Sequence, residues 1–428
     1  MAQAEHMIWG NKFGYGIQST YGTAVNCSAG IALTNLNADF TAGIQTVDQR
    51  KALGNSYRDA QIGREFQIGL KTPETTFEFD VSPDNVMPIL WSFFQKSAIQ
   101  DADPYAKYYW AYDRTVTDVW LTLVKYMGAG EYSHRLKDCV CDSITFTCEE
   151  GQPLKASAHF ISGAALETNR DGSSDTFTVA AIAPLMFQDA TFDLDTIAVN
   201  MPTFTITLNN NARVVPYDNQ TGTKIILGAL DVTGSFQVPW SQTTEGGNNW
   251  IDNFTAGPQV EATNPKGFGR ISIWWGTQVK GQEIANALSE FSIISNFVAT
   301  SANPVGDDET LIEVGFTGAR TLTSDSVVSG TTVTTSADPV VVATAQSADA
   351  ALSTNFKYGD IFYLIGAAAA GDQVSRIVKS TTSTTVIGVY PAYSQTDTEK
   401  NYRIDRSPIT ITLCDDVDQN SPDMDTFA

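Results

Sequence analysis

The sequence predicts a mainly β protein in which one β-rich domain occurs twice. A β-type run, a turn, a second β-type run and an aromatic helix occur in this order at residues 66–94, and again in different letters at 223–254. Each copy then continues with a short aromatic strand and a long candidate hairpin, at 139–164 and at 288–319. A fixed order of elements that recurs about 150 residues later indicates two related units. Such self-complementary units favour assembly over catalysis.

The repeat sets the expected domain boundaries. Residues 1–190 form the first copy, and residues 191–319 with 407–428 form the second. We also match the segment 183–190 with 407–416 in type and context. Residues 320–406 have no equivalent in the first copy and are rich in Ser, Thr and Ala with few charges. Their short, turn-bounded strands predict a small β-barrel or sandwich, inserted at a loop as an exposed appendage.

In the first copy, a strand candidate at 31–40 is followed by a polar stretch at 46–64. This stretch is long for a connection between strands, and long loops in compact domains are usually functional or disordered. We therefore predict a loop that becomes ordered on contact with another subunit. Its basic residues are Arg50, Lys51, Arg58 and Arg64.

A predicted strand pair follows at 66–81. Its apolar residues, such as Phe77, alternate with Glu78 and Asp80, which indicates a half-buried strand with an acidic outer face. Ser82 and Pro83 then supply helix-start signals, and the apolar spacing after them predicts a short helix.

The second copy repeats this pattern. Trp250 and Phe254 stand at the position of the helix, and the alternation turns Asp231, Ser235 and Gln237 away from the core.

The hairpin at 139–164 carries three of the five cysteines. Strict alternation puts Cys139 and Cys141 on one face of its first strand, and puts Ile144 and Cys148 on the other. An odd number of scattered cysteines is not a disulfide framework, so we expect buried, reduced thiols.

Charge and composition exclude several classes of function. The formal net charge is −22 at pH 7, and such a surface repels nucleic acid. The first residues do not resemble a secretory signal, and no apolar run reaches the roughly 20 residues that a membrane helix needs. We expect a soluble protein that is synthesised in a cytoplasm.

A search for chemistry returns no site. His6, His134 and His159 have no second His or Cys at metal-ligand spacing, and the acidic tail from Asp416 departs from a calcium loop where Gly and Glu are required. No nucleophile or zinc-protease motif occurs. We therefore expect no enzymatic activity, no metal and no cofactor.

Several segments resemble one known family. They are the start GYGIQSTYGTAV, the long basic-polar loop before a hairpin, the hairpin DSITFTCEEGQPLKASAHFIS and the run LNNNARVV with ILGALDVTGSFQVPW. Together they resemble tail tube proteins of bacteriophages with long, non-contractile tails, over roughly residues 10–319 and 408–415. The resemblance implies two tandem tail-tube-like β-sandwich domains, each with a short flanking α-helix.

The resemblance also implies a function. Inner strands of neighbouring subunits would form a barrel around a channel, and stacked rings would make the conduit for genome ejection. With two domains per chain, three chains would complete a pseudo-sixfold ring. Its partners would be the tape-measure protein, the tail terminator and the baseplate or tip proteins, and DNA would pass without specific binding. The loop with Arg50, Lys51, Arg58 and Arg64 would contact the next ring, and the channel lining would include Glu78, Asp80, Asp231, Ser235 and Gln237.

Two alternatives stay open at this point. One is another virion component, such as a tail terminator or a capsid decoration protein. The other is a carbohydrate-binding adhesive β-module, which would usually carry a secretion signal. An enzyme ranks last because no site supports it.

Overall fold

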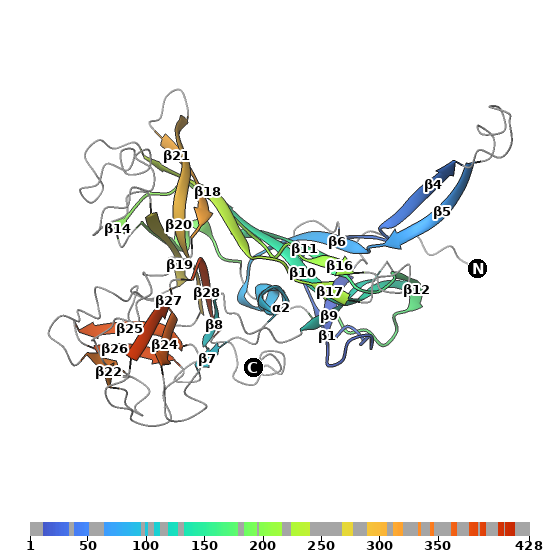
Figure 1. The fold of residues 1–428 in the computed structure, drawn as a ribbon, viewed down its shortest axis with the longest axis horizontal. Coiled ribbons are helices and arrows are strands. Elements are labelled where there is room, and N and C mark those ends of the chain that lie inside the picture. The colour runs from blue at the N-terminus through green and yellow to red at the C-terminus, as the bar shows by residue number, and fades with distance from the viewer. Residues whose placement is uncertain are drawn as a thin grey trace.

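A computed structural model provides the fold. It describes residues 12–33, 38–50, 64–95, 99–101, 107–111, 119–126, 132–178, 184–194, 197–215, 224–239, 268–276, 289–305, 311–319, 333–334, 343–345, 361–365, 376–383, 386–390, 401–405 and 407–415. These residues are mainly β, which confirms the predicted fold class, and their one α-helix is α2 (Pro83–Phe94) (Figure 1).

The largest element is an antiparallel sheet of eight strands, here called the first sheet. Its neighbouring strands are hydrogen-bonded in the order β3, β6, β11, β10, β15, β18, β21 and β20. The bounds are β3 (Asp39–Thr41), β6 (Glu74–Asp80), β11 (Lys155–Ser162), β10 (Tyr132–Glu149), β15 (Thr203–Asn209), β18 (Asp231–Pro239), β21 (Leu311–Gly318) and β20 (Ser289–Val305).

Two long strands, β10 and β20, belong to both layers of the protein. Their second halves lie in the first sheet. The first half of β10 pairs with β9 (Trp120–Tyr126) and β12 (Glu167–Asp171). The first half of β20 pairs with β19 (Phe268–Gly276) and β28 (Ile409–Asp415). The core therefore lies between layers that share a continuous backbone.

Shorter strands complete the second layer. β1 (Lys12–Gln18) pairs with β2 (Ala29–Gly30) and β9, while β13 (Ala190–Leu194) pairs with β14 (Ile197–Ala198) and β19. β8 (Lys107–Ala111) pairs with β7 (Ile99–Asp101) and with β28. A short 3₁₀ turn, η2 (Phe187–Asp189), leads into β13.

Helix α2 lies in the core, as its apolar spacing predicts. Ser82 precedes it in extended conformation, Pro83 occupies its first turn, and Phe93 is fully buried. Gln95 ends the helix in the left-handed region with φ 48°, and its side chain bonds both the N–H and the C=O of Val119. The expected second helix, around Trp250 and Phe254, lies outside the described residues.

Two details of the first copy differ from the prediction. Of the strand predicted at 31–40, residues 39 and 40 belong to β3, whereas residues 31–33 are not in a strand and 34–37 lie outside the described residues. The strand pair predicted at 66–81 is wrong: β5 (Arg64–Lys71) pairs with β4 (Ile44–Arg50), whereas β6 pairs with β11 and β3. The reason is that β6 aligns Phe77 and Phe79 with Ala158 and Ala156 in the core.

The hairpin of β10 and β11 is confirmed, but the predicted position of Cys148 is wrong. A β-bulge between Cys141 and Ser143 inserts Asp142 as an extra residue. Because an extra residue changes the phase of the alternation, Cys141, Ile144 and Cys148 all become buried in the same core. Cys27, Cys139, Cys141 and Cys148 are buried and free, as expected.

The described strands between residues 333 and 405 form a six-stranded sheet of their own. Its order is β22 (Val333–Thr334), β23 (Ala343–Ala345), β26 (Val386–Tyr390), β25 (Arg376–Ser383), β24 (Ile361–Ile365) and β27 (Asn401–Asp405). The pairings given for these strands join them to one another.

Eight pairings of the first half of the chain recur in the second half. The pairings of the first half are β1·β2, β1·β9, β9·β10, β10·β11, β10·β12, β6·β11, β3·β6 and β4·β5. Their equivalents in the second half, in the same order, are β13·β14, β13·β19, β19·β20, β20·β21, β20·β28, β18·β21, β15·β18 and β16·β17. The last pair joins β16 (Arg213–Val215) to β17 (Lys224–Ile226). The predicted match between 183–190 and 407–416 is wrong, since the strand in the position of β28 is β12.

Candidate channel-lining face

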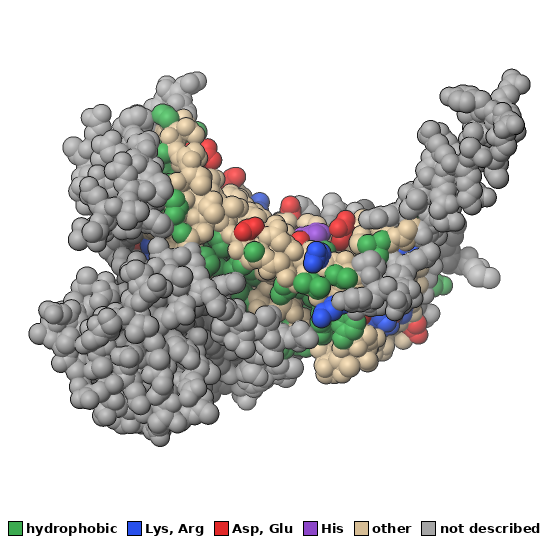
Figure 2. All heavy atoms as spheres, in the orientation of Figure 1, with side chains coloured by type: hydrophobic (Ala, Val, Ile, Leu, Met, Phe, Trp, Pro, Cys, Tyr) green, Lys and Arg blue, Asp and Glu red, His purple; other side chains and the backbone are tan. Residues whose placement is uncertain are grey.

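One side of the first sheet is mainly polar, apart from an apolar cluster of Val140 and Ile161 with Ile225. We call this side, on β6, β11, the second half of β10, β15, β18 and β21, the polar face. It follows from the alternation in each strand: in β15, Phe204, Ile206 and Leu208 are buried, and the residues between them are partly exposed. Figure 2 shows mainly tan polar and backbone atoms along the upper edge of the described region, with few charged side chains.

Hydroxyl side chains are aligned across this face. In one row, neighbouring strands place opposite one another Glu78, Ser157, Thr145, Thr207, Thr233 and Thr317. In the next row they place Asp80, Lys155, Thr147, Thr205, Ser235 and Gly315. The hydroxyl oxygens of Thr145 and Thr207 lie 3.1 Å apart. Neutral hydroxyls both donate and accept hydrogen bonds, so such a surface is well hydrated and carries no fixed positive charge.

The charged residues on the polar face are mostly acidic. The acidic residues are Glu74, Glu78 and Asp80 on β6, Asp231 on β18 and Glu313 on β21. The basic residues of the same strands are Lys155 and His159 on β11. An acidic surplus on a shared surface repels the phosphates of nucleic acid.

The five residues predicted to line a channel all lie on this one face. Their aligned neighbours are Ser157 for Glu78, Lys155 for Asp80, Asn209 for Asp231, Thr205 for Ser235 and Glu313 for Gln237. Glu78 and Asp231 are exposed, and the other three are partly exposed. Residues from β6 and β18, about 150 positions apart, thus share a surface because β10 pairs with β15.

Sequence reasoning missed the centre of this face. The hydroxyl residues of β10, β11 and β15, such as Thr145, Ser157 and Thr207, were not predicted as candidate lining residues, although they make up most of the aligned rows. The signal was present, because SITFTC and TFTITLN alternate hydroxyl with apolar residues.

His159 is the one histidine on the polar face within the described residues. Its Nδ1 lies 3.4 Å from Asp142 Oδ2, and its Nε2 lies 3.5 Å from Glu74 Oε2. Asp142 is available because it is the bulged residue of β10. A hydrogen bond with Asp142 and the charges of Asp142 and Glu74 raise the pKa of His159 above its usual value, although partial burial opposes this. The imidazole therefore joins three strands.

The family comparison decides what this surface belongs to. A family model described as phage tail tube protein matches residues 9–263, which is more than half of the chain. The chain belongs to the phage tail tube protein family. A search for similar curated proteins gave no match.

This tail tube protein is therefore a structural component of the virion tail, and its family assembles into a tube. A mainly β fold with a long, hydrated, acidic face suits that role, because a conduit for DNA should not bind phosphates.

Two of the basic residues predicted for contact between rings, Arg50 and Arg64, belong to an arm of this tail tube protein. β4 and β5 form a two-stranded hairpin that projects away from the first sheet (Figure 1), and Arg50 pairs with Arg64 at its outer end. The expected loop at 46–64 thus begins and ends in strands. Lys51 and Arg58 lie outside the described residues.

The described part of the tail tube protein holds no group of three or more His, Cys, Asp and Glu residues that could bind a metal ion. Nor does it contain a helix that is long and apolar enough to span a membrane. The thiols of Cys27 and Cys148 are protonated at neutral pH, because burial raises the pKa of Cys27 to about 12 and that of Cys148 to about 11.

We predict that replacing His159 with Gln destabilises the protein at low pH only. Because the pKa of His159 in the folded protein exceeds its ordinary value of about 6.5, its ion pairs stabilise the fold below that pH. The contribution is lost as the pH rises through the folded pKa. Urea unfolding of both proteins at about pH 5.5 and at about pH 8.5 measures this. An equal loss of stability at both values contradicts the assignment.

Proposed function

We propose that three copies of this tail tube protein close into a ring, and that the rings stack into the tube of a long, non-contractile phage tail. The observation that carries the proposal is the pairing of β10 with β15, which runs over seven residue pairs from Ser143 with Asn209 to Glu149 with Thr203. It joins the sheet of the first half of the chain to that of the second. The eight recurring pairings support a duplicated domain, with copies at 1–190 and at 191–319 with 407–428.

The same contact can be repeated between chains. In the recurring pairings β20 takes the place of β10, and β3 takes the place of β15. Within the described residues, β3 pairs with β6 alone, and the part of β20 after Val298 pairs with β21 alone, so each has an open edge. Pairing β20 of one chain with β3 of the next covers both edges, and unpaired edges otherwise promote aggregation.

The number of strands favours three chains. Each chain contributes the eight strands of the first sheet, so three chains close a barrel of twenty-four. With strands about 4.8 Å apart and tilted by roughly 40°, its backbone diameter is roughly 50 Å. A ring of six chains would be twice as wide. Three chains with two domains each give pseudo-sixfold symmetry.

In such a ring the polar face lines the channel, with Glu78, Asp80, Asp231, Ser235 and Gln237 among its residues. The protein then acts as a passive conduit for genome ejection rather than as an enzyme, and DNA passes without specific binding. Its ends would meet the tape-measure protein, the tail terminator and the baseplate or tip proteins, after synthesis in the host cytoplasm.

Negative-stain microscopy of the purified protein tests this function. We expect tubes, and end-on averages with three outer protrusions per ring, one for each segment 320–406. Six protrusions would contradict the three-chain ring, and monodisperse monomers under all conditions would contradict self-assembly.

The arm of β4 and β5 is proposed to contact the next ring. Its basic residues would meet carboxylates in an otherwise acidic protein. Replacing Arg50, Arg58 and Arg64 with Glu should leave folded monomers and single rings but stop stacking, as measured by microscopy and sedimentation. Tubes of normal length from this variant would show that the arm has another role.

Residues 320–406 are proposed to form a separable domain on the outside of the tube. Both ends of the segment reach the same residue: Ala319 donates its N–H to Asn296 O at 2.7 Å, and Asn296 Nδ2 donates to Ser407 O at 2.7 Å. Because these ends are adjacent, a short linker can join Ala319 to Ser407. The shortened protein should remain soluble and form thinner tubes by microscopy, whereas an insoluble or unfolded product argues that the segment stabilises the core.

A further inference from the structure

Within one chain, residues 184–187 lie across the end of the β6·β11 pair, and we call this segment the clip. Leu185 donates its N–H to Val81 O at 3.0 Å and accepts from the N–H of Leu154 at 2.7 Å. Phe187 donates to Gln152 O at 3.0 Å. The clip precedes β13, the first strand of the second half. It therefore ties the second half of the chain to the sheet end of the first half.

The N-terminal residues have the same relation to β1. Strand β13 begins with Ala190 opposite Trp275, and strand β1 begins with Lys12 opposite Tyr126. The pair of Tyr15 with Ala29 corresponds to that of Leu194 with Ile197, so Lys12 corresponds to Thr191. Counting back by equal steps places His6, Met7 and Ile8 at the positions of Leu185, Met186 and Phe187. The last two residues of both segments are large and apolar.

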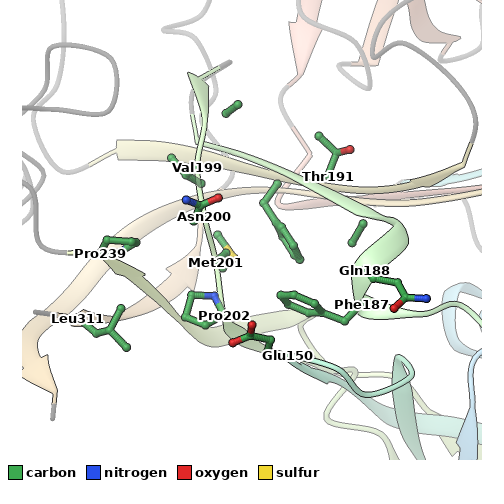
Figure 3. Close-up of a pocket in the computed structure, with 13 residues that line it drawn as sticks. Glu150, Phe187, Gln188, Thr191, Val199, Asn200, Met201, Pro202, Pro239 and Leu311 are labelled. Carbon is green, nitrogen blue, oxygen red and sulfur yellow. The ribbon is translucent and has the colours of Figure 1, made fainter. Parts of the chain in front are cut away.

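The second half of the chain offers a matching acceptor. The pair β18·β21 ends with Pro239 opposite Leu311, as β6·β11 ends with Asp80 opposite Lys155. A pocket of about 510 Å³ adjoins this end. Pro239, Leu311, Met201 and Pro202 line it, together with Phe187 on its far side (Figure 3). Its lining is mainly apolar, and Glu150 is its one charged residue.

The chain's own N-terminus is not the occupant. Figure 1 shows β1 and the pair β18·β21 at opposite ends of the described body. Residue 8 is four positions from Lys12, which allows a reach of roughly 14 Å. In the proposed ring, however, the β20 edge of one chain meets the N-terminal half of the next. This boundary between chains is equivalent to the boundary between the two halves of one chain, where the clip lies.

We propose that residues 6–8 of each chain dock at the end of β18·β21 in the neighbouring chain of the same ring, with the apolar side chains of Met7 and Ile8 against Pro239, Leu311 and Met201. The docking rests on the proposed ring. It adds a second contact at each boundary between chains, beside the pairing of β20 with β3.

Site-directed cross-linking tests the docking. A variant with Met7→Cys and Leu311→Cys is assembled into tubes, oxidised mildly and run on a denaturing, non-reducing gel. We expect cross-links between chains in assembled protein only, in a ladder that ends at three chains. The matched control combines Met7→Cys with Thr168→Cys, an exposed position on β12, and should give no ladder. Each single-cysteine variant shows whether the introduced thiol forms a disulfide with a native cysteine.

Each other outcome overturns the inference. A cross-link within unassembled monomers would place the N-terminus on its own chain. A ladder beyond three would place it between rings, and assembled tubes without a cross-link would exclude the contact. If the wild-type chain forms no tubes, the proposed function fails, and the docking fails with it.

A deletion gives an independent measurement. Removing residues 2–9 should leave the thermal midpoint of the monomer unchanged, because these residues contact another chain. The concentration needed for assembly should rise by about tenfold or more, since two large apolar side chains are no longer buried. An unchanged assembly threshold would contradict the docking.

Discussion

Replacing Ala302 with Pro is expected to abolish tube assembly while the monomer stays folded. The open edge of β20 already contains Pro304, which pairs with Ile312. Proline in a strand places its nitrogen away from the ladder, so this position faces the open edge. Ala302 lies two residues earlier and has the same orientation. Its N–H is therefore free to bond β3 of the next chain, while the ladder to β21 does not use it.

The wild-type edge already lacks a donor at Pro304, and proline at position 302 removes a second donor from the same edge. Because each missing donor weakens the pairing of β20 with β3, and a ring has three such boundaries, closure should fail. Size-exclusion chromatography and microscopy measure assembly, and thermal unfolding checks the monomer. Ala302→Ser keeps the N–H and should assemble normally. Normal tubes from the proline variant would show that this edge is not a boundary between chains.

Replacing Glu78 and Asp80 with Lys is expected to slow DNA release strongly while tubes still form. Both residues lie on the polar face, where Asp80 is opposite Lys155. In a ring of three, the variant adds six lysines to the wall of the channel, and stacked rings repeat them along its length. Each phosphate that lysine neutralises adds affinity, so release should slow by about tenfold or more at low salt and recover as salt rises.

The measurement is the rate of DNA ejection from particles that carry variant tails, followed by dye fluorescence at several salt concentrations. Thr168→Lys with Asp171→Lys is the matched control, because both positions are exposed on β12 outside the first sheet. The control should eject at the wild-type rate. Equal slowing in both variants would mean that Glu78 and Asp80 do not line the channel.

Local patterns predicted the local structure well. The alternation of Phe77 and Phe79 with Glu78 and Asp80 gave the orientation of β6, because burial of one face fixes the register of a strand. Ser82 and Pro83 gave the start of α2, since an extended residue followed by proline initiates helices. The hairpin at 139–164 was also predicted, and Gly151 adopts φ 75° in its turn.

Non-local pairing accounts for what the sequence did not reveal. Thr410 pairs with Ala111 across the two halves of the chain, and no short-range pattern specifies such a partner. The bulge at Asp142 changes which side chains of β10 share a face, although its letters resemble an ordinary strand. The polar face itself exists because Thr145 meets Thr207 across the halves. The sequence could identify single residues of the polar face, but it could not show that they share one surface.

The pairing of β10 with β15 inside one polypeptide also has a consequence for the accuracy of ring formation. In the proposed ring of three chains, half of the junctions between domains would be present before any subunits meet, at the high effective concentration that a covalent link provides. Subunits that each supply two domains can only build circles with an even number of them. Rings of five or seven domains, which are the nearest wrong sizes, therefore cannot form from such subunits. Subunits with a single domain have no such restriction on the number of domains in a ring.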